Sequence, residues 1–112
     1  MTEYKLVYFD ARGRAEISRM LFKIAKVDFE DFRYPIDINS SGITHKEFDK
    51  DKKEGRLTLS MDKLPALQVS NSGILTTLFQ SHAIERFLAC DFSMMGTTLL
   101  EKTMIDALCE TI

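Results

Sequence analysis

The feature that most limits how this chain can fold is a strand-like, a helix-like and a second strand-like segment in immediate succession. Residues 5–9 (KLVYF) are almost continuously apolar, which is typical of a strand covered on both faces. Residues 13–25 place apolar side chains at helical spacing. Residues 29–33 alternate in polarity and predict a second strand, which Pro35 ends. This order favours a parallel βαβ unit with a right-handed crossover.

The helix predicted over residues 13–25 has one apolar and one charged face. The side chains expected to point inward are Ile17, Met20, Leu21, Ile24 and Ala25, and those expected to face solvent are Glu16, Arg19, Lys23 and Lys26. Arg12 and Arg14 stand at its start, where positive charge opposes the helix macrodipole. This misfit indicates that the two arginines serve something other than the helix.

The segment 37–60 is the least regular part of the chain. Residues 39–42 (NSSG) signal a turn. Residues 44–54 predict a short polar helix, with Thr44 as its N-cap and Glu47 as the capping-box partner.

The second half of the chain predicts a hairpin followed by a helix. Residues 66–69 and 74–78 predict two antiparallel strands joined by a turn at 70–73. A helix follows from Ser81, and its expected buried side chains are Ala83, Ile84, Phe87 and Leu88. The order βαβ, α, ββα matches a thioredoxin-like α/β domain, which we assign to residues 1–90.

One further helix is predicted within residues 91–112. Thr98-Leu-Leu-Glu101 forms a capping box, and the apolar residues that recur at helical spacing are Leu100, Met104, Leu108 and Ile112. An exposed apolar stripe of this kind marks an interaction site or an instability. The helix is therefore expected to fold back on the first domain, to pair with another chain or to fray.

The composition excludes several classes of protein. With 45% hydrophobic and 29% charged residues, the 112-residue chain is expected to be soluble and packed. A net charge of −2 gives no global attraction to nucleic acid. Cys90 and Cys109 form no CxxC, so a disulfide framework and a metal site are unsupported. Lys5 and Asp10 interrupt the early apolar residues, so no signal peptide is expected. Since no run of about 20 apolar residues is present either, a cytoplasmic protein without membrane association is expected.

Three separated segments carry candidate binding chemistry and would converge in such a fold. The Tyr8–Arg14 turn combines a phenol, backbone N–H groups and guanidinium charge, which suits an anion or a thiolate. Lys63-Leu64-Pro65 places a proline at the entry to a strand. Gln80-Ser81 places an amide and a hydroxyl at a helix N-terminus, where unpaired N–H groups favour a carboxylate. Each segment alone has an ordinary structural explanation, and their joint occurrence in this order is what indicates a site.

The three segments also carry a family resemblance. The stretches YKLVYFDARGRAEISRMLF, KLPALQV and LFQSHAIERFLA resemble the N-terminal domain of cytosolic glutathione transferases of the tyrosine type, with sigma and alpha classes among the relatives. In that family an all-helical domain follows, so the resemblance implies that residues 91–112 hold only the first helix of a truncated helical domain. No tryptophan is present, although relatives commonly place one in the irregular segment; Phe48 could occupy that region.

The resemblance implies roles at the thiol end of glutathione. Tyr8 matches the tyrosine whose hydroxyl hydrogen-bonds the glutathione sulfur. Arg14 matches the arginine that supports the thiolate electrostatically. Since the nucleophile belongs to the cosubstrate, the protein itself needs no catalytic cysteine.

The resemblance also implies roles along the tripeptide backbone. Lys63 matches a basic residue near the glycyl end. Leu64 matches the residue whose backbone pairs with the cysteinyl unit, ahead of a cis Pro65. Gln80 and Ser81 match the pair that holds the γ-glutamyl carboxylate.

The function expected from this resemblance is conjugation of reduced glutathione to hydrophobic electrophiles, with glutathione as cosubstrate, no tightly bound cofactor and a homodimer as the family default. The alternative is a truncated, non-catalytic fragment that binds glutathione or a partner subunit. A thiol–disulfide oxidoreductase is disfavoured, because no cysteine lies in the Tyr8–Arg14 turn. The electrophile is not identified by the sequence, and isomerase or peroxidase activity stays open.

Overall fold

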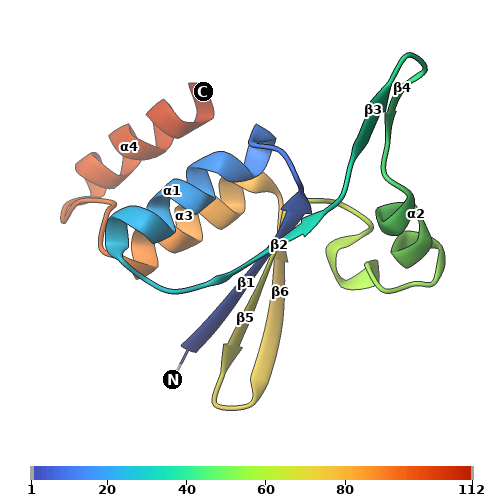
Figure 1. The fold of residues 1–112 in the computed structure, drawn as a ribbon. Coiled ribbons are helices and arrows are strands. Elements are labelled where there is room, and N and C mark those ends of the chain that lie inside the picture. The colour runs from blue at the N-terminus through green and yellow to red at the C-terminus, as the bar shows by residue number, and fades with distance from the viewer. Residues whose placement is uncertain (1, 112) are drawn as a thin grey trace.

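The computed structural model describes residues 2–111 and contains a four-stranded sheet with helices packed against it (Figure 1). The strands are β1 (Thr2–Phe9), β2 (Glu30–Tyr34), β3 (Asp37–Asn39), β4 (Gly42–Thr44), β5 (Ala66–Asn71) and β6 (Ile74–Phe79). The helices are α1 (Glu16–Ala25), α2 (Lys46–Lys53), α3 (Ser81–Asp91) and α4 (Leu99–Thr111), with short 3₁₀ turns η1 (Gly13–Ala15) and η2 (Thr58–Ser60).

The sheet has the strand order β2-β1-β5-β6, with β1 parallel to β2 and the other pairs antiparallel. The parallel βαβ unit and the following hairpin are therefore confirmed, as is the thioredoxin-like α/β class. Val7 pairs with Phe32 on one side and with Ala66 on the other, so β1 is bonded along both edges. The C-terminal end of this central strand carries Tyr8.

Two hydrophobic clusters lie on opposite faces of the sheet. Leu6 belongs to a cluster with Ala15, Phe22, Leu67, Ile84 and Leu88, beneath α1 and α3. The next residue, Val7, belongs to a cluster with Tyr34, Phe48, Leu57 and Ala66, beneath α2 and the segment after it. Successive strand residues point to opposite faces. The continuous apolar run is thus explained, because both faces of β1 are covered.

Helix α1 has the predicted faces only in part, since Leu21 packs against the core and Lys23 is exposed as expected. Arg19, expected in solvent, is 1% exposed, whereas Met20 and Ile24, expected inside, are exposed. The helix is also shorter, because Gly13–Ala15 form the 3₁₀ turn η1 ahead of it. The buried face of the helix, with Ser18, Arg19 and Phe22, is therefore rotated by part of a turn from the predicted one. The buried Arg19 guanidinium bonds backbone carbonyls and a carboxylate.

The irregular segment contains a hairpin that the sequence pattern did not reveal. The turn predicted at 39–42 is present, but it joins two short strands, β3 and β4, which project away from the sheet (Figure 1). Helix α2 begins at Lys46 after His45, and that N-cap residue makes no side-chain capping bond. The predicted Thr44–Glu47 capping box is therefore wrong. His45 instead bonds Asp49 one turn later, with 3.0 Å between Nδ1 and Oδ1.

Helix α3 begins at Ser81 as predicted, but its buried face is only partly the predicted one. Ile84 and Leu88 are buried, whereas Ala83 and Phe87 are exposed. The inward positions are taken by Ala89 and, unexpectedly for a carboxylate, by Glu85. The helix is thus rotated so that one acidic side chain lies beneath the surface.

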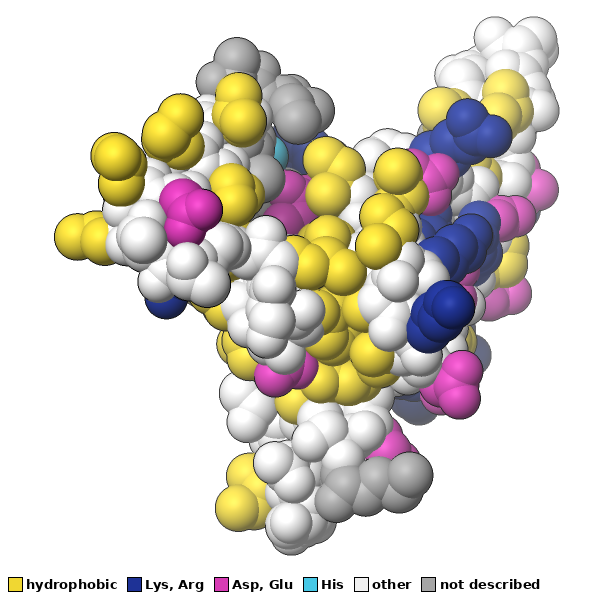
Figure 2. All heavy atoms as spheres, turned by 90° about the vertical axis from the view of Figure 1, so that its left-hand side faces the viewer, with side chains coloured by type: hydrophobic (Ala, Val, Ile, Leu, Met, Phe, Trp, Pro, Cys, Tyr) yellow, Lys and Arg dark blue, Asp and Glu magenta, His cyan; other side chains and the backbone are white. Residues whose placement is uncertain are grey.

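Helix α4 lies beside α3 with its apolar stripe exposed. Arg86 of α3 forms ion pairs with Asp106 and Glu110 of α4. Leu99, Leu100, Met104 and Leu108 are all exposed, and Figure 2 shows hydrophobic side chains gathered across this side of the molecule. Ile112, the last member of the predicted stripe, lies outside the described residues. The division into residues 1–90 and 91–112 stays a prediction.

The predicted capping box at the start of α4 is confirmed. The Glu101 amide donates to Thr98 Oγ1 at 3.1 Å, and the Thr98 amide donates to Glu101 Oε1 at 3.0 Å. Hydrogen bonds from the backbone of Thr97 and Thr98 lower the pKa of Glu101 to about 2. Across residues 2–111 no helix is long and apolar enough to cross a membrane.

Candidate functional site

The turn after β1 holds the Tyr8 phenol in contact with the backbone. The Arg14 amide donates a hydrogen bond to Tyr8 Oη over 3.2 Å. Gly13, with φ +41°, makes this approach feasible, because a Cβ on that residue would lie 2.5 Å from Tyr8 Oη. Since the hydroxyl oxygen already accepts a bond from the backbone, its own proton is available to a second group. This places a phenolic donor at the end of the central strand.

Beneath this turn lies Arg19, a residue that the sequence reasoning placed in solvent. Its guanidinium donates to the carbonyl oxygens of Phe9 and Ala11 and, through Nε, to Asp31 Oδ1 at 3.1 Å. The guanidinium carbon also lies 5.8 Å from the centroid of the Tyr8 ring, within cation–π range. Arg19 therefore holds the backbone of the turn that carries the phenol.

Nothing in the local sequence distinguishes Arg19 from the exposed lysines of the same helix. The signal lies in Asp31 on the neighbouring parallel strand, where the register pairs it with Leu6 of β1. That register is known only once the strands are aligned.

The start of α3 forms the second wall of the site. Gln80 adopts φ +75° and is the N-cap of α3, with its carbonyl accepting from the Ile84 amide at 3.0 Å. A non-glycine residue with positive φ costs of order 1–3 kcal/mol and is found preferentially at functional sites. Ser81 follows as the first helical residue, so its amide is among the unpaired donors of the helix N-terminus.

An open pocket of about 480 Å³ lies between these two walls. Its lining residues come from the turn after β1 and from the first turns of α1 and α3: Gly13, Arg14, Ile17, Gln80, Ser81, His82 and Glu85. The structure thus brings the Gly13–Arg14 part of the first predicted segment together with Gln80 and Ser81, whereas Tyr8 lies behind the turn and is not a lining residue. Within residues 2–111 the Arg14 side chain forms no ion pair, so its charge is available to a ligand.

The third predicted segment lies beside this pocket and does not line it. The Leu64–Pro65 peptide bond is cis, as the resemblance implied. Pro65 is buried, and Lys63 is exposed. Ala66, which follows, pairs with Val7 of β1, so the segment adjoins the strand end that carries Tyr8.

Phe48 does not replace the missing tryptophan as an exposed aromatic side chain. Phe48 is buried in the second cluster, with its ring centroid 4.9 Å from that of Phe9. Arg56, which follows α2, pairs with Asp51 and Glu54. Phe48 is therefore a packing residue of α2.

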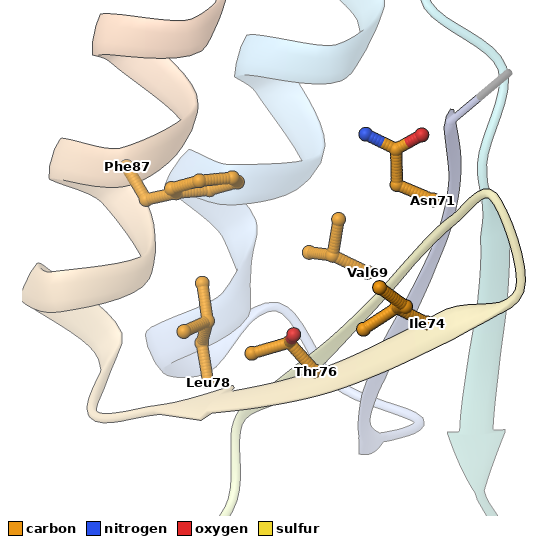
Figure 3. Close-up of a pocket in the computed structure, with 6 residues that line it drawn as sticks. All are labelled: Val69, Asn71, Ile74, Thr76, Leu78 and Phe87. Carbon is orange, nitrogen blue, oxygen red and sulfur yellow. The ribbon is translucent and has the colours of Figure 1, made fainter.

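A second hollow, of about 350 Å³, lies between the β5–β6 hairpin and α3 (Figure 3). Its lining residues are Val69, Asn71, Ile74, Thr76, Leu78 and Phe87. None of them is ionisable, and none belongs to the three predicted segments. Among residues 2–111 no group of three or more His, Cys, Asp or Glu side chains is arranged to hold a metal ion.

Comparisons with known proteins match most of the chain to one family. Residues 4–90 match the family model described as glutathione S-transferase, N-terminal domain. The chain is 37% identical to hematopoietic prostaglandin D synthase of Rattus norvegicus over 112 residues, which is 100% of this chain and 48% of the relative. It is also 37% identical to glutathione S-transferase 3 of Caenorhabditis elegans over 111 residues, covering 99% of this chain and 45% of the relative.

Solved structures give the same result. The crystal structure of a major nematode-specific glutathione transferase of C. elegans superimposes with a TM-score of 0.79 at 33% identity, covering 98% of this chain and 46% of that one. The chain therefore spans about half the length of the relatives that it matches.

Proposed function

The chain belongs to the glutathione S-transferase family, and from that membership we propose that it binds reduced glutathione and conjugates it to hydrophobic electrophiles. The observation that carries the proposal is the hydrogen bond from the Arg14 amide to Tyr8 Oη, at 3.2 Å. It engages the phenol oxygen as an acceptor and leaves the phenol proton for the sulfur of the cosubstrate. Glutathione is a cosubstrate here and not a resident cofactor.

In the proposed reaction the glutathione thiol loses its proton to solvent, and Tyr8 donates a hydrogen bond to the thiolate that remains. The thiolate then attacks an electrophilic carbon, forming the carbon–sulfur bond while the leaving group departs or the added electron pair is protonated. A free thiol has a pKa near 8.5, and lowering it by about two units requires about 2.7 kcal/mol of differential stabilisation. One hydrogen bond to an anion contributes about 1.5–3 kcal/mol, and the Arg14 charge supplements it.

The remaining parts of glutathione are assigned to the other two segments. The N-terminus of α3, with Gln80 and Ser81, is proposed to hold the γ-glutamyl carboxylate, because its unpaired amides favour an anion. The backbone of Leu64, ahead of cis Pro65, is proposed to pair with the cysteinyl unit. Lys63, which is exposed, is proposed to lie near the glycyl carboxylate.

A second candidate is a protein that binds glutathione or a partner subunit without turnover. The exposed stripe of Leu100, Met104 and Leu108 on α4 favours it, because such a surface suits another protein segment. We propose a homodimer as the assembly in either case. A cytoplasmic role in detoxification belongs to the first candidate alone.

The two candidates differ in turnover. Retention on immobilised glutathione together with conversion of a chromogenic electrophile supports the transferase, whereas retention without conversion supports the second candidate. Tyr8→Phe is expected to keep retention and to lower the conversion rate by about 10- to 100-fold, the value of one hydrogen bond to an anion. Tyr4→Phe, on the same strand but bonded to Asp91, is the control and is expected to leave conversion unchanged. An unchanged rate in Tyr8→Phe would refute the proposed role.

A further inference from the structure

Glu85 is a buried carboxylate at a place where a ligand pocket meets the packed interior. It lies one helical turn after Ser81, on the same side of α3, and only 4% of it is exposed. It also lines the pocket between the turn after β1 and the start of α3. Burying an ionised carboxylate is costly unless it is paired.

The protein itself supplies little to offset this charge. Within the described part of the chain, the hydrogen-bond partner of Glu85 is His82, whose Nδ1 lies 3.3 Å from Glu85 Oε1. The His82 side chain is 40% exposed, so its contribution is weakened by solvent. On the opposite wall of the pocket Ile17 offers no polar group, and Arg14 forms no ion pair with Glu85. The second carboxylate oxygen of Glu85 is therefore available to a cation from outside the chain.

The pocket thus has two electrostatic ends. The amide donors at the start of α3 and the unpaired guanidinium of Arg14 favour an anion. Glu85, about 6 Å further along the helix axis at 1.5 Å per residue, favours a cation. A group that carries an ammonium and a carboxylate close together satisfies both ends. The free end of a γ-glutamyl residue is such a zwitterion.

We propose that Glu85 receives the α-ammonium group of the γ-glutamyl residue and makes the pocket selective for a zwitterionic head group. The proposal rests on the proposed function, since it assigns one more residue to the glutathione site. It extends the site from the helix terminus into the face between α1 and α3. No covalent step is involved.

The test compares two ligands with two proteins by isothermal titration calorimetry. The ligands are reduced glutathione and glutaryl-Cys-Gly, which lacks only the α-amino group. Glu85→Gln keeps the size of the side chain and removes its charge. We expect the substitution to weaken glutathione binding about 10-fold or more, the value of one charge-assisted hydrogen bond, and to change glutaryl-Cys-Gly binding less than 2-fold. Glu30→Gln, an exposed carboxylate on β2, is the control and should change neither affinity.

Each other outcome either overturns or supports the proposal. Equal weakening of both ligands by Glu85→Gln assigns Glu85 to the packing of α3 and overturns the proposal. If Glu85→Gln does not fold, the unsubstituted chain decides: an affinity ratio of the two ligands near one overturns the proposal, and a ratio of about 10 or more in favour of glutathione, reduced in Glu85→Asp, supports it. Binding of both ligands at equal strength overturns the role of Glu85 but leaves the proposed function intact. Binding of neither ligand refutes the proposed function and this inference together.

Discussion

Replacing Arg19 with methionine should destabilise the chain far more than replacing Arg33 with methionine, although both arginines pair with Asp31. Arg19 is 1% exposed and bonds two backbone carbonyls as well as the carboxylate. The Arg33 side chain is 40% exposed and bonds Asp31 and Asp10 near the surface. Each variant therefore removes one of the two arginines that pair with Asp31, the buried one or the exposed one.

The magnitude follows from burial. Removing one partner of a buried ion pair costs about 3–5 kcal/mol. The Asp31 side chain is 27% exposed and keeps Arg33 as a partner, so the lower end of that range applies. We expect Arg19→Met to lower the free energy of unfolding by about 3 kcal/mol, whereas an exposed pair such as that of Arg33 contributes about 0–1 kcal/mol.

Urea denaturation followed by far-UV circular dichroism measures both values, and equal slopes in urea are required for the comparison. Arg19→Lys is a third variant, which keeps the charge but loses the planar fork that reaches two carbonyls and a carboxylate. It should fall between the wild type and Arg19→Met. A loss below about 1 kcal/mol for Arg19→Met, equal to that of Arg33→Met, would refute the reasoning, because the buried pair would then be worth no more than a surface pair.

Three further predictions concern the site and the last helix. Gly13→Ala should lower the conversion rate of the electrophile at least as much as Tyr8→Phe does, while the fold persists by circular dichroism, because its Cβ would lie 2.5 Å from Tyr8 Oη and displace the hydroxyl; an unchanged rate contradicts this. Gln80→Gly should raise the free energy of unfolding in urea by about 1 kcal/mol by relieving the positive φ, and it should weaken glutathione binding because the amide side chain is lost; an unchanged free energy of unfolding contradicts the strain. The pKa of Glu101 is lowered to about 2, so its ionised carboxylate stabilises the start of α4 at any pH above the ordinary pKa of 4.5. This stabilisation should be lost as the pH falls from 4.5 through 2. NMR titration of the Glu101 carboxyl carbon measures that pKa directly, and Thr98→Ala should move it upward.

The four strands of the main sheet and the starts of α3 and α4 could be predicted from the sequence because they depend on local pattern. The apolar run of residues 5–9 requires burial on both faces, and both faces are covered in the structure. The capping box at Thr98 is likewise a local arrangement of hydroxyl, amide and carboxylate, and it forms as predicted. Such features depend on residues within one turn of each other.

The burial of Arg19 could not be predicted, because its partners come from elsewhere in the fold. Arg19 is paired with a carboxylate on the neighbouring strand and with carbonyls of a turn, none of which is recognisable from helical spacing. The burial of Glu85 could not be predicted either, because this carboxylate interrupts the otherwise apolar buried face of α3 next to a pocket. The β3–β4 hairpin escaped prediction for a different reason, since its strands have only three residues each and are exposed.

The pocket between the turn after β1 and the start of α3 has a consequence for folding. Its two walls lie far apart in the sequence and meet only after β5 and β6 have joined the sheet beside β1. A molecule held by both walls acts as a removable cross-link that the unfolded chain cannot bind. At a concentration a hundredfold above its Kd, such a ligand adds about 2.7 kcal/mol to the free energy of unfolding. Resistance to proteolysis should therefore rise along the whole sheet when glutathione is present, and not only in the loops that touch it.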